Sequence, residues 1–364
     1  MKEAIKNTEL DNALFPDALA LLKQLITIPS FSKEENNTAD CIENFLEQRH
    51  IKTNKYLNNV WAVNKHFDEK KFTILLNSHH DTVKPNKGYT LNPFEAIEKD
   101  GKLFGLGSND AGGPLVSLIA TFVYFYHVEN LSFNLVLAAT AEEEISGHDG
   151  IEILLPRLPK IDCGIVGEPT LLDMAIAEKG LLVLDCTAHG IAGHAARNEG
   201  VNAIYKAMKD IEWFSSFKFE NASEFLGPVH MAVTSVNTLN KTHNIVPSEC
   251  SFIVDIRVNE LYSFDQIIAE IKKNVLSDVI PRSTRLKPSF IEEDHPLVIS
   301  GNKMGLKSYG SPTCSDRAMM NFPTLKMGPG DSARSHSADE FIFINEIKNG
   351  IEKYIQLLQN LKLL

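Results

Sequence analysis

The chain has 364 residues, more than one compact core ordinarily holds, so we expect two domains. Hydrophobic residues make up 43% of it and charged residues 23%, the composition of a folded globular protein rather than a disordered one. The 36 Lys and Arg residues stand against 47 Asp and Glu residues, a formal net charge of -11. A net acidic chain without a basic stripe is a poor binder of nucleic acid.

The cysteines and the apolar stretches exclude two further classes of protein. There are five cysteines, which are Cys41, Cys163, Cys186, Cys250 and Cys314. They are far apart and form no CxxC pair, so we expect buried thiols in a reducing compartment rather than disulfides or a Cys-type zinc site. The N-terminus lacks an apolar signal core, and Pro114–Tyr126 is too short to cross a bilayer. A cytoplasmic enzyme without a membrane partner is therefore expected.

Helices and buried strands alternate in the first half of the chain. Apolar periodicity predicts helices at Asp17–Ile26, Asn37–Arg49 and Leu115–His127. Short apolar runs predict buried strands at Phe72–Asn77, Asn134–Ala139 and Asp162–Val166. This alternation is typical of an α/β domain with a mainly parallel central sheet flanked by helices.

After Pro169 the pattern changes to a smaller α+β block. Strands are expected at Leu181–Ala188, Met231–Asn237 and Ser251–Val258, and helices at Val201–Phe214 and Phe264–Val275. Beyond Glu293 the chain returns to the first domain. We therefore predict a catalytic domain formed by residues 1–176 and 290–364, with residues 177–289 inserted into it as a second domain.

Three of the predicted strands end at residues that can bind metal ions or transfer protons. His79 and Asp81 follow the first strand, Glu142–Glu144 the second and Glu168 the third. In parallel sheets, ligand sites form at these strand ends. His79 and Asp81 point to the same face of a strand and His80 to the other, so Asp81 could hold the ring nitrogen of His79 that does not bind metal. An HxD pair alone also fits a histidine that is simply hydrogen-bonded.

A glycine-rich turn, GLGSNDAGG at residues 105–113, carries Asp110 just before a predicted helix. Asp110 or Asn109 could merely cap that helix. Such a turn can also cradle phosphate, but this one has no GK[ST] sequence and carries an acid, which makes phosphate the weaker interpretation.

The segment TAEEEISG, residues 140–147, places three carboxylates directly after a buried strand. They are costly there unless they are solvated or neutralised by cations. In a metal site one acid can bind the metal while its neighbour takes a proton from water. SARSHSADEF, residues 332–341, adds His336, with Glu340 four residues later. Two histidines and several carboxylates form the mixed set that Zn²⁺, Co²⁺ or Mn²⁺ accept.

Together and in this order, these motifs resemble the zinc amidohydrolase family of acetylornithine deacetylase, succinyl-diaminopimelate desuccinylase, aminoacylase-1 and carboxypeptidase G. The resemblance covers nearly the whole chain. It implies two divalent metal ions, Zn²⁺ first and Co²⁺ or Mn²⁺ as alternatives, with Asp110 as the bridging ligand. It also implies His79 and Glu168 on one metal and Glu144 and His336 on the other. Glu143 resembles the general base, and Asp81 the residue that supports His79.

The inserted domain resembles the family's lid, which commonly dimerises, so the resemblance implies a homodimer. His194 matches a histidine that reaches a neighbouring active site and helps to hold the oxyanion; packing at the lid interface is its alternative. Asn244 and Arg257 match substrate-side positions, and Arg257 could instead form an ion pair on a strand face. Arg317 resembles an arginine that grips the substrate carboxylate.

Within the family, HHDTVKP, SNDAGG and SHSADEF are most similar to acetylornithine deacetylase. The expected activity is hydrolysis of a linear amide bond that removes an acetyl or succinyl group from an amino acid such as ornithine or citrulline, in arginine biosynthesis. Succinyl-diaminopimelate desuccinylase and dipeptidase are alternatives within the family. A non-catalytic metal- or ligand-binding protein would lack a ligand or the base, and none is missing. A nucleotide-binding protein would use residues 105–113 without metal.

Overall fold

The computed structural model describes residues 8–363, with side chains described from residue 13 onwards. The chain divides into two compact units. The larger unit comprises the residues up to Ile176, Ile291–Tyr309 and the residues from Ser315 on, and the smaller comprises Ala177–Phe290 and Gly310–Cys314.

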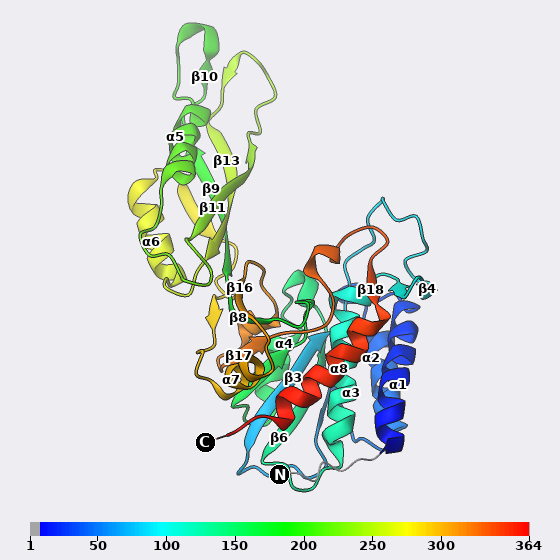
Figure 1. Ribbon diagram of the computed structural model, residues 1–364. Coiled ribbons are helices and arrows are strands. Elements are labelled where there is room, and N and C mark those ends of the chain that lie inside the picture. The colour runs from blue at the N-terminus through cyan, green and yellow to red at the C-terminus, as the bar shows by residue number, and fades with distance from the viewer. Residues whose placement is uncertain (1–7, 364) are drawn as a thin grey trace. The chain divides into compact units, whose positions relative to one another are not determined.

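The larger unit is built on a mixed β-sheet with a parallel centre (Figure 1). In spatial order its strands are β1 (Asn54–Tyr56), β2 (Asn59–Val63), β6 (Phe133–Thr140), β3 (Phe72–His79), β7 (Cys163–Val166), β17 (Thr324–Lys326) and β8 (Met174–Glu178). The pairs β6–β3, β3–β7 and β7–β17 are parallel, whereas β1–β2, β2–β6 and β17–β8 are antiparallel. The predicted α/β fold is confirmed, with antiparallel strands flanking the parallel centre.

Strands β3 and β6 are buried along almost their whole length, which requires cover on both faces and explains their unbroken apolar sequences. Helices α1 (Thr8–Ile26), α3 (Gly113–Tyr126) and α8 (Ile344–Gln359) pack on one another, and α3 lies against β3 and β6. A separate cluster packs Leu75, Val136 and Ala138 of the sheet against Leu154 of α4 (Ile151–Leu154). Helices α2 (Asn36–Glu47) and α7 (Pro296–Lys303) contact α1 and α8, respectively.

Several helices differ from the sequence-based expectation: α1 is longer than predicted, and α4 and α7, like α8, were not predicted. Helix α1 begins at Thr8 and runs through Pro16, whereas the apolar periodicity predicted a helix only at Asp17–Ile26. Helix α8 was not predicted, although its apolar residues follow a helical period. Its buried face is formed by Ile347, Gly350, Ile351, Tyr354, Leu357 and Leu358.

A small three-stranded sheet joins segments far apart in the sequence. Strand β5 (Lys102–Phe104) pairs with β4 (Ile97–Lys99) on one side and with β18 (Phe341–Phe343) on the other. Because β5 leads into the Asp110 turn and β18 follows the His336 segment, this pairing brings the two segments together.

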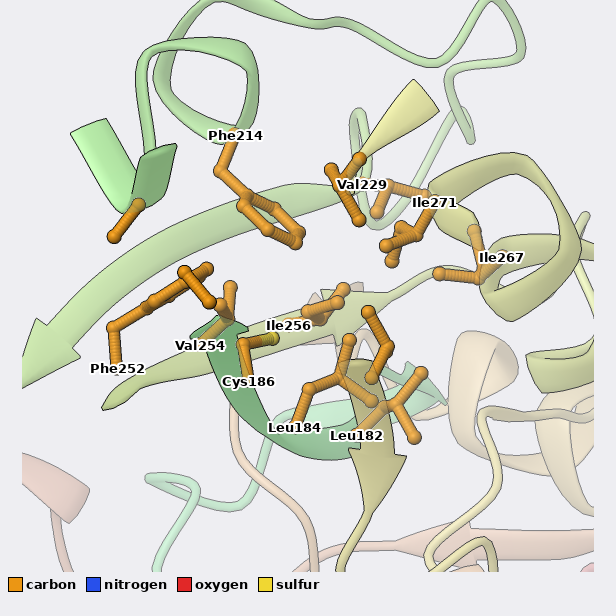
Figure 2. Close-up of a cluster of buried hydrophobic side chains, with 14 of the residues drawn as sticks. Leu182, Leu184, Cys186, Phe214, Val229, Phe252, Val254, Ile256, Ile267 and Ile271 are labelled. Atoms are coloured by element: carbon orange, nitrogen blue, oxygen red, sulfur yellow. The ribbon is translucent and has the colours of Figure 1, made fainter. Parts of the chain in front are cut away.

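The smaller unit has a four-stranded antiparallel sheet in the order β11 (His230–Asn237), β13 (Glu249–Val258), β9 (Gly180–His189) and β14 (Asp278–Pro281). Alternate residues of β9 and β13 are buried, as expected for a sheet covered on one face. Figure 2 shows them, among them Leu184 and Phe252, facing Phe214 of α5 (Ala203–Ser216) and Ile271 of α6 (Phe264–Asn274). A separate two-stranded sheet joins β10 (Gly193–His194) to β12 (Ile245–Val246).

The last short strands are β15 (Ser289–Phe290) and β16 (Ser308–Ser311), which both pair with β8. None of the five cysteines, all of which lie among the described residues, forms a disulfide; Cys163, Cys186 and Cys250 are buried and the other two are partly exposed. Among residues 8–363, no helix is both long and apolar enough to cross a membrane.

Candidate metal centre

Strand register gathers the candidate ligands at one edge of the central sheet. His79, the last residue of β3, pairs with Thr140 of β6, and Asn77 pairs with Val166 of β7. The acids of residues 142–144 and Glu168 follow directly after these partners. Parallel pairing therefore brings together three sequence segments that lie far apart in the chain.

Asp110 lies between the two predicted histidine ligands. Its Oδ1 is 3.3 Å from His79 Nε2, and its Oδ2 is 3.8 Å from His336 Nε2. His336 Nε2 is also 3.0 Å from Glu144 Oε2. Two ligand atoms that each lie about 2.0–2.1 Å from one tetrahedral zinc ion are about 3.3–3.4 Å apart. The spacing thus fits a carboxylate shared by two metal ions.

Two groups of ligand atoms meet at His79. Its Nε2 is 3.8 Å from Glu168 Oε1 and 3.9 Å from Glu143 Oε2. Ligand atoms of His79, Asp110 and Glu144 all lie within 4.8 Å of one another, as do those of His79, Glu143 and Glu168. The structure therefore brings together all five residues predicted as ligands and the predicted base.

The buried nitrogen of His79 tests whether this cluster fits a cation. His79 is 1% exposed, and its Nε2 has no hydrogen-bond partner among the described residues. Its other nitrogen, Nδ1, lies 3.1 Å from the carbonyl oxygen of Asp81 and 3.3 Å from Oδ1 of that residue. Nδ1 is therefore the atom that carries the proton, and the Nε2 lone pair is left for a cation. This donor set fits Zn²⁺, Co²⁺ or Mn²⁺.

The carboxylates and imidazoles shift one another's pKa. Burial alone would lower the pKa of His79, but Asp110 and Asp81 raise it well above its usual value. The Glu144 carboxylate raises the pKa of His336 to about 9. Burial raises the pKa of Glu143 well above its usual value, and the carboxylates around it oppose the effect of His79. The cluster therefore attracts positive charge, either as protons or as metal ions.

Asp81 makes more contacts than the sequence predicted. Besides facing His79, its Oδ1 accepts a hydrogen bond from the backbone N–H of Glu143 (3.1 Å). Its Oδ2 accepts bonds from the N–H of Glu144 (3.1 Å) and the hydroxyl of Ser32 (2.6 Å). One fully buried carboxylate thus orients the imidazole of His79 and fixes the turn that carries the base and a ligand.

Glu142 and His80 turn away from the cluster. Glu142 has φ of 57°, and its Oε2 accepts from the N–H of Asp149 (3.4 Å); a Cβ on Gly147 would lie 1.8 Å from that oxygen. His80 contacts the hydroxyl of Thr38 and a backbone carbonyl instead. Burial lowers its pKa to about 4, so it is a neutral structural histidine.

The residues predicted on the substrate side belong to different units. His194, Asn244 and Arg257 lie in the smaller unit. His194 is exposed, and its Nδ1 accepts from the N–H of Ala196 (3.2 Å). Asn244 is also exposed. Arg257 forms two bonds to Asp255, of 2.8 and 3.1 Å, which is the strand-face ion pair that was its alternative.

Arg317 lies in the larger unit and is 1% exposed. Its Nη1 and Nη2 donate to the carbonyl oxygens of Ala175 (2.8 Å) and Ile176 (2.7 Å). These bonds link it to β8, and its role toward substrate stays a prediction.

Sequence reasoning missed Asp316 and did not foresee the role of Glu340. Asp316 accepts from the hydroxyl of Thr140 (2.6 Å), and burial raises its pKa to about 6. Glu340 was noted only for its spacing from His336, yet it bonds the backbone of the Asp110 turn. The only available signal was closeness in sequence to a predicted site residue: Asp316 precedes Arg317, and Glu340 follows His336 by four residues.

Two imidazoles and four carboxylates gathered at one edge of an α/β sheet form a site suited to divalent metal ions. A family model described as Peptidase family M20/M25/M40 matches residues 75–360. The chain therefore belongs to this family of metal-dependent hydrolases and peptidases, within the group expected from the sequence.

Curated relatives include two desuccinylases. The succinyl-diaminopimelate desuccinylase of Buchnera aphidicola subsp. Acyrthosiphon pisum (strain Tuc7) is 26% identical over 373 residues, covering 94% of this chain and 98% of that protein. Its counterpart from Orientia tsutsugamushi (strain Ikeda) is 27% identical over 303 residues, covering 78% of each. These relatives favour the desuccinylase alternative over the expected likeness to acetylornithine deacetylase.

Solved structures share the fold. Aminopeptidase PepT from Bacillus cereus ATCC 10987 matches with a TM-score of 0.76 and 17% identity, over 95% of this chain and 98% of that one. The YXEP protein of Bacillus subtilis, described as a dinuclear metal binding peptidase from the M20 family, matches with a TM-score of 0.74 and 13% identity over the same shares.

Proposed function

We propose that this protein is a two-metal amidohydrolase that removes an N-succinyl group from an amino acid, with succinyl-diaminopimelate as its first candidate substrate. The observation that carries the proposal is the position of Asp110 between His79 and His336, with Glu143 beside the same cluster. The succinyl group is supported by the desuccinylases among the relatives.

In the proposed site the ligands would form two sets that share Asp110. His79 and Glu168 would complete the first metal site, and Glu144 and His336 the second. When bound, two such ions polarise the amide carbonyl and lower the pKa of the attacking water. Zn²⁺ is the first candidate, with Co²⁺ and Mn²⁺ as alternatives.

Glu143 acts as the general base and then as the general acid. Its carboxylate takes a proton from the attacking water and delivers it to the leaving amine. Asp81 keeps Glu143 in place through the hydrogen bond to its backbone N–H.

Roles outside the metal cluster are supported by the family resemblance. Residues 1–176 and 290–364 form the catalytic domain, and residues 177–289 a lid that forms a homodimer. His194 helps to hold the oxyanion in a neighbouring active site, while Asn244, Arg257 and Arg317 contact the substrate. For Arg317 this requires a change in its present bonds to β8.

The second candidate function is hydrolysis of acetyl- or succinyl-ornithine or -citrulline. It is supported by the motifs HHDTVKP, SNDAGG and SHSADEF, which resemble acetylornithine deacetylase. Both functions use the same metal site and base, and they differ only in the amino acid and the acyl group that the enzyme selects.

The test is a substrate panel measured with Zn²⁺ or Co²⁺. It contains succinyl-diaminopimelate, the acetyl and succinyl forms of ornithine and citrulline, and several dipeptides. We expect the highest kcat/KM for succinyl-diaminopimelate. Preference for an ornithine or citrulline amide would replace the first candidate by the second. No turnover of any amide by the metal-loaded protein would overturn the enzyme assignment.

The Glu143→Gln variant tests the role of Glu143 as the general base. It removes the base while keeping the shape of the side chain, so we expect metal binding to be retained and kcat to fall by about 10²–10⁴-fold. Activity near that of the wild type at a full metal load would contradict the role given to Glu143.

A further inference from the structure

Two buried side chains fasten the turn that carries Asp110 to the segment that carries His336. The first is Glu340, which is 2% exposed. Its Oε1 accepts hydrogen bonds from the backbone N–H groups of Asn109 (2.8 Å) and Asp110 (2.9 Å). Its Oε2 accepts one from the N–H of Gly107 (3.1 Å). One buried carboxyl group thus accepts hydrogen bonds from three amides of the same turn.

The second is Asn109, which is fully buried. Its Oδ1 accepts from the backbone N–H of Asp331 (3.0 Å), and its Nδ2 donates to the carbonyl of the same residue (3.1 Å). The preceding Gly330 has φ of +93°, and a Cβ there would lie 2.5 Å from Asn109 Oδ1. This two-point contact fixes both the distance and the orientation of the backbone at Asp331 relative to the Asp110 turn.

The two fastenings lie at opposite ends of residues 331–340, and His336 lies between them. His336 has φ of 58°, and its Nε2 is 3.8 Å from Asp110 Oδ2. A further contact, from Asn86 Nδ2 to the carbonyl of His336 (3.1 Å), comes from outside the Asp110 turn and does not couple the two ligands. Glu340 and Asn109 join the two segments through side-chain bonds to the backbone, and Ser335, next to His336, adds a side-chain hydrogen bond to the Asp110 carboxylate.

We infer that Glu340 and Asn109 are positioning residues that set the distance between Asp110 and His336, and thereby the affinity of the second metal site. The inference rests on the two-metal site proposed above. At the second site two of three ligands depend on these side chains. At the first site only the shared Asp110 does, because the other two ligands follow paired strands, β3 and β7.

The experiment measures metal affinity directly. Metal-free wild type, Glu340→Gln and Asn109→Ala are titrated with Co²⁺ against a chelating indicator, which gives the dissociation constants of the two sites. Asn64→Ala is the matched control: Asn64 is 2% exposed, and its Oδ1 accepts from the N–H of Leu135 (2.9 Å). Leu135 lies near the start of β6, at the opposite end from the site.

We expect Glu340→Gln and Asn109→Ala to weaken the second site about 10–100-fold and the first site much less, as supporting residues of metal ligands commonly do. Excess Co²⁺ should restore kcat, because both side chains bond backbone groups and neither is a proposed metal ligand or the proposed base. Asn64→Ala should lower the melting temperature and leave both dissociation constants unchanged.

Equal weakening of both sites, or unchanged affinity of the second site in both variants, would overturn the inference. If Glu340→Gln fails to fold, Asn109→Ala alone tests the inference, because it removes the other link, the two hydrogen bonds between Asn109 and Asp331. A wild type that binds fewer than two Co²⁺ ions would instead refute the proposed two-metal function before the variants are compared.

Discussion

One contact of Asp81 could be predicted from the sequence, and its other contacts could not. Its spacing from His79 was enough to predict the contact with the imidazole, since alternate strand residues share a face. Its bonds to the N–H groups of Glu143 and Glu144 could not be predicted. They depend on the register between β3 and β6, which brings residues 62 and 63 positions apart into contact.

Asp81→Asn should therefore destabilise the metal-free protein as well as slow the enzyme. The amide keeps the shape, but it loses the charge that strengthens the bonds to the turn. We expect the free energy of unfolding to fall by about 2–3 kcal/mol, measured by chemical denaturation at pH 7. Ser32→Ala removes only one bond to the same carboxylate and should cost about 1 kcal/mol. An Asp81→Asn protein as stable as the wild type would contradict this role.

His80 makes a second residue-scale prediction, about pH. Its pKa is lowered from 6.5 to about 4 in the folded protein, so the unfolded chain binds the proton more readily. The stability it contributes is present above pH 6.5 and is lost as the pH falls toward 4. The loss is roughly 3 kcal/mol, since each pKa unit corresponds to about 1.4 kcal/mol.

The measurement compares the metal-free wild type with His80→Gln between pH 7 and pH 4. The variant has no imidazole to protonate, so its stability should fall less steeply over this interval. If the free energy of unfolding depends on pH with the same slope in both proteins, His80 does not titrate in this way.

At the scale of elements, the strands buried on both faces were predictable and the three-residue strands were not. Strands β3, β6 and β7 are short apolar runs buried on both faces, and their sequences show it. Strands β5 and β18 have three residues each, too few to display a period, and they pair across more than 230 positions. Their pairing brings the Asp110 and His336 segments together. The candidate ligands could therefore be identified from the sequence, but the strand pairing that assembles them could not.

The core of the smaller unit gives the element-scale prediction. Phe214 of α5 is 2% exposed, and its ring lies 6.0 Å from that of Phe252 in an edge-to-face arrangement. Phe214→Ala should lower the free energy of unfolding by about 3–5 kcal/mol. The exposed Lys209 on the same helix provides the control, since Lys209→Ala should change it by less than about 0.5 kcal/mol.

Both variants should keep the metal affinity of the wild type, because all the candidate ligands lie in the larger unit. Denaturant unfolding and Co²⁺ titration of the same samples test the two halves of this prediction. Loss of Co²⁺ binding by folded Phe214→Ala would show that the metal site depends on the core of the smaller unit.

At the scale of the whole molecule, the fold gathers several acids into one cluster that needs a counter-charge. Four candidate carboxylates and the buried Asp316 surround only two imidazoles. The composition shows an excess of acids, but only the fold, through the strand ends and the turn that carries Asp110, brings these acids together. Buried carboxylates without counter-charges oppose folding, so divalent cations should stabilise this protein and not merely activate it.

Removal of metal should therefore lower the melting temperature, and return of Zn²⁺ or Co²⁺ should restore it. An ion that binds only the folded protein adds about 2.7 kcal/mol per site at a concentration 100 times its dissociation constant. Mg²⁺ at the same concentration should add less, because it prefers six oxygen ligands and this site offers two imidazoles. The comparison is made by thermal unfolding in chelator and in each ion. Identical melting temperatures with and without Zn²⁺ would mean that the carboxylates are neutralised by protons, and that the cluster does not hold metal in the folded protein.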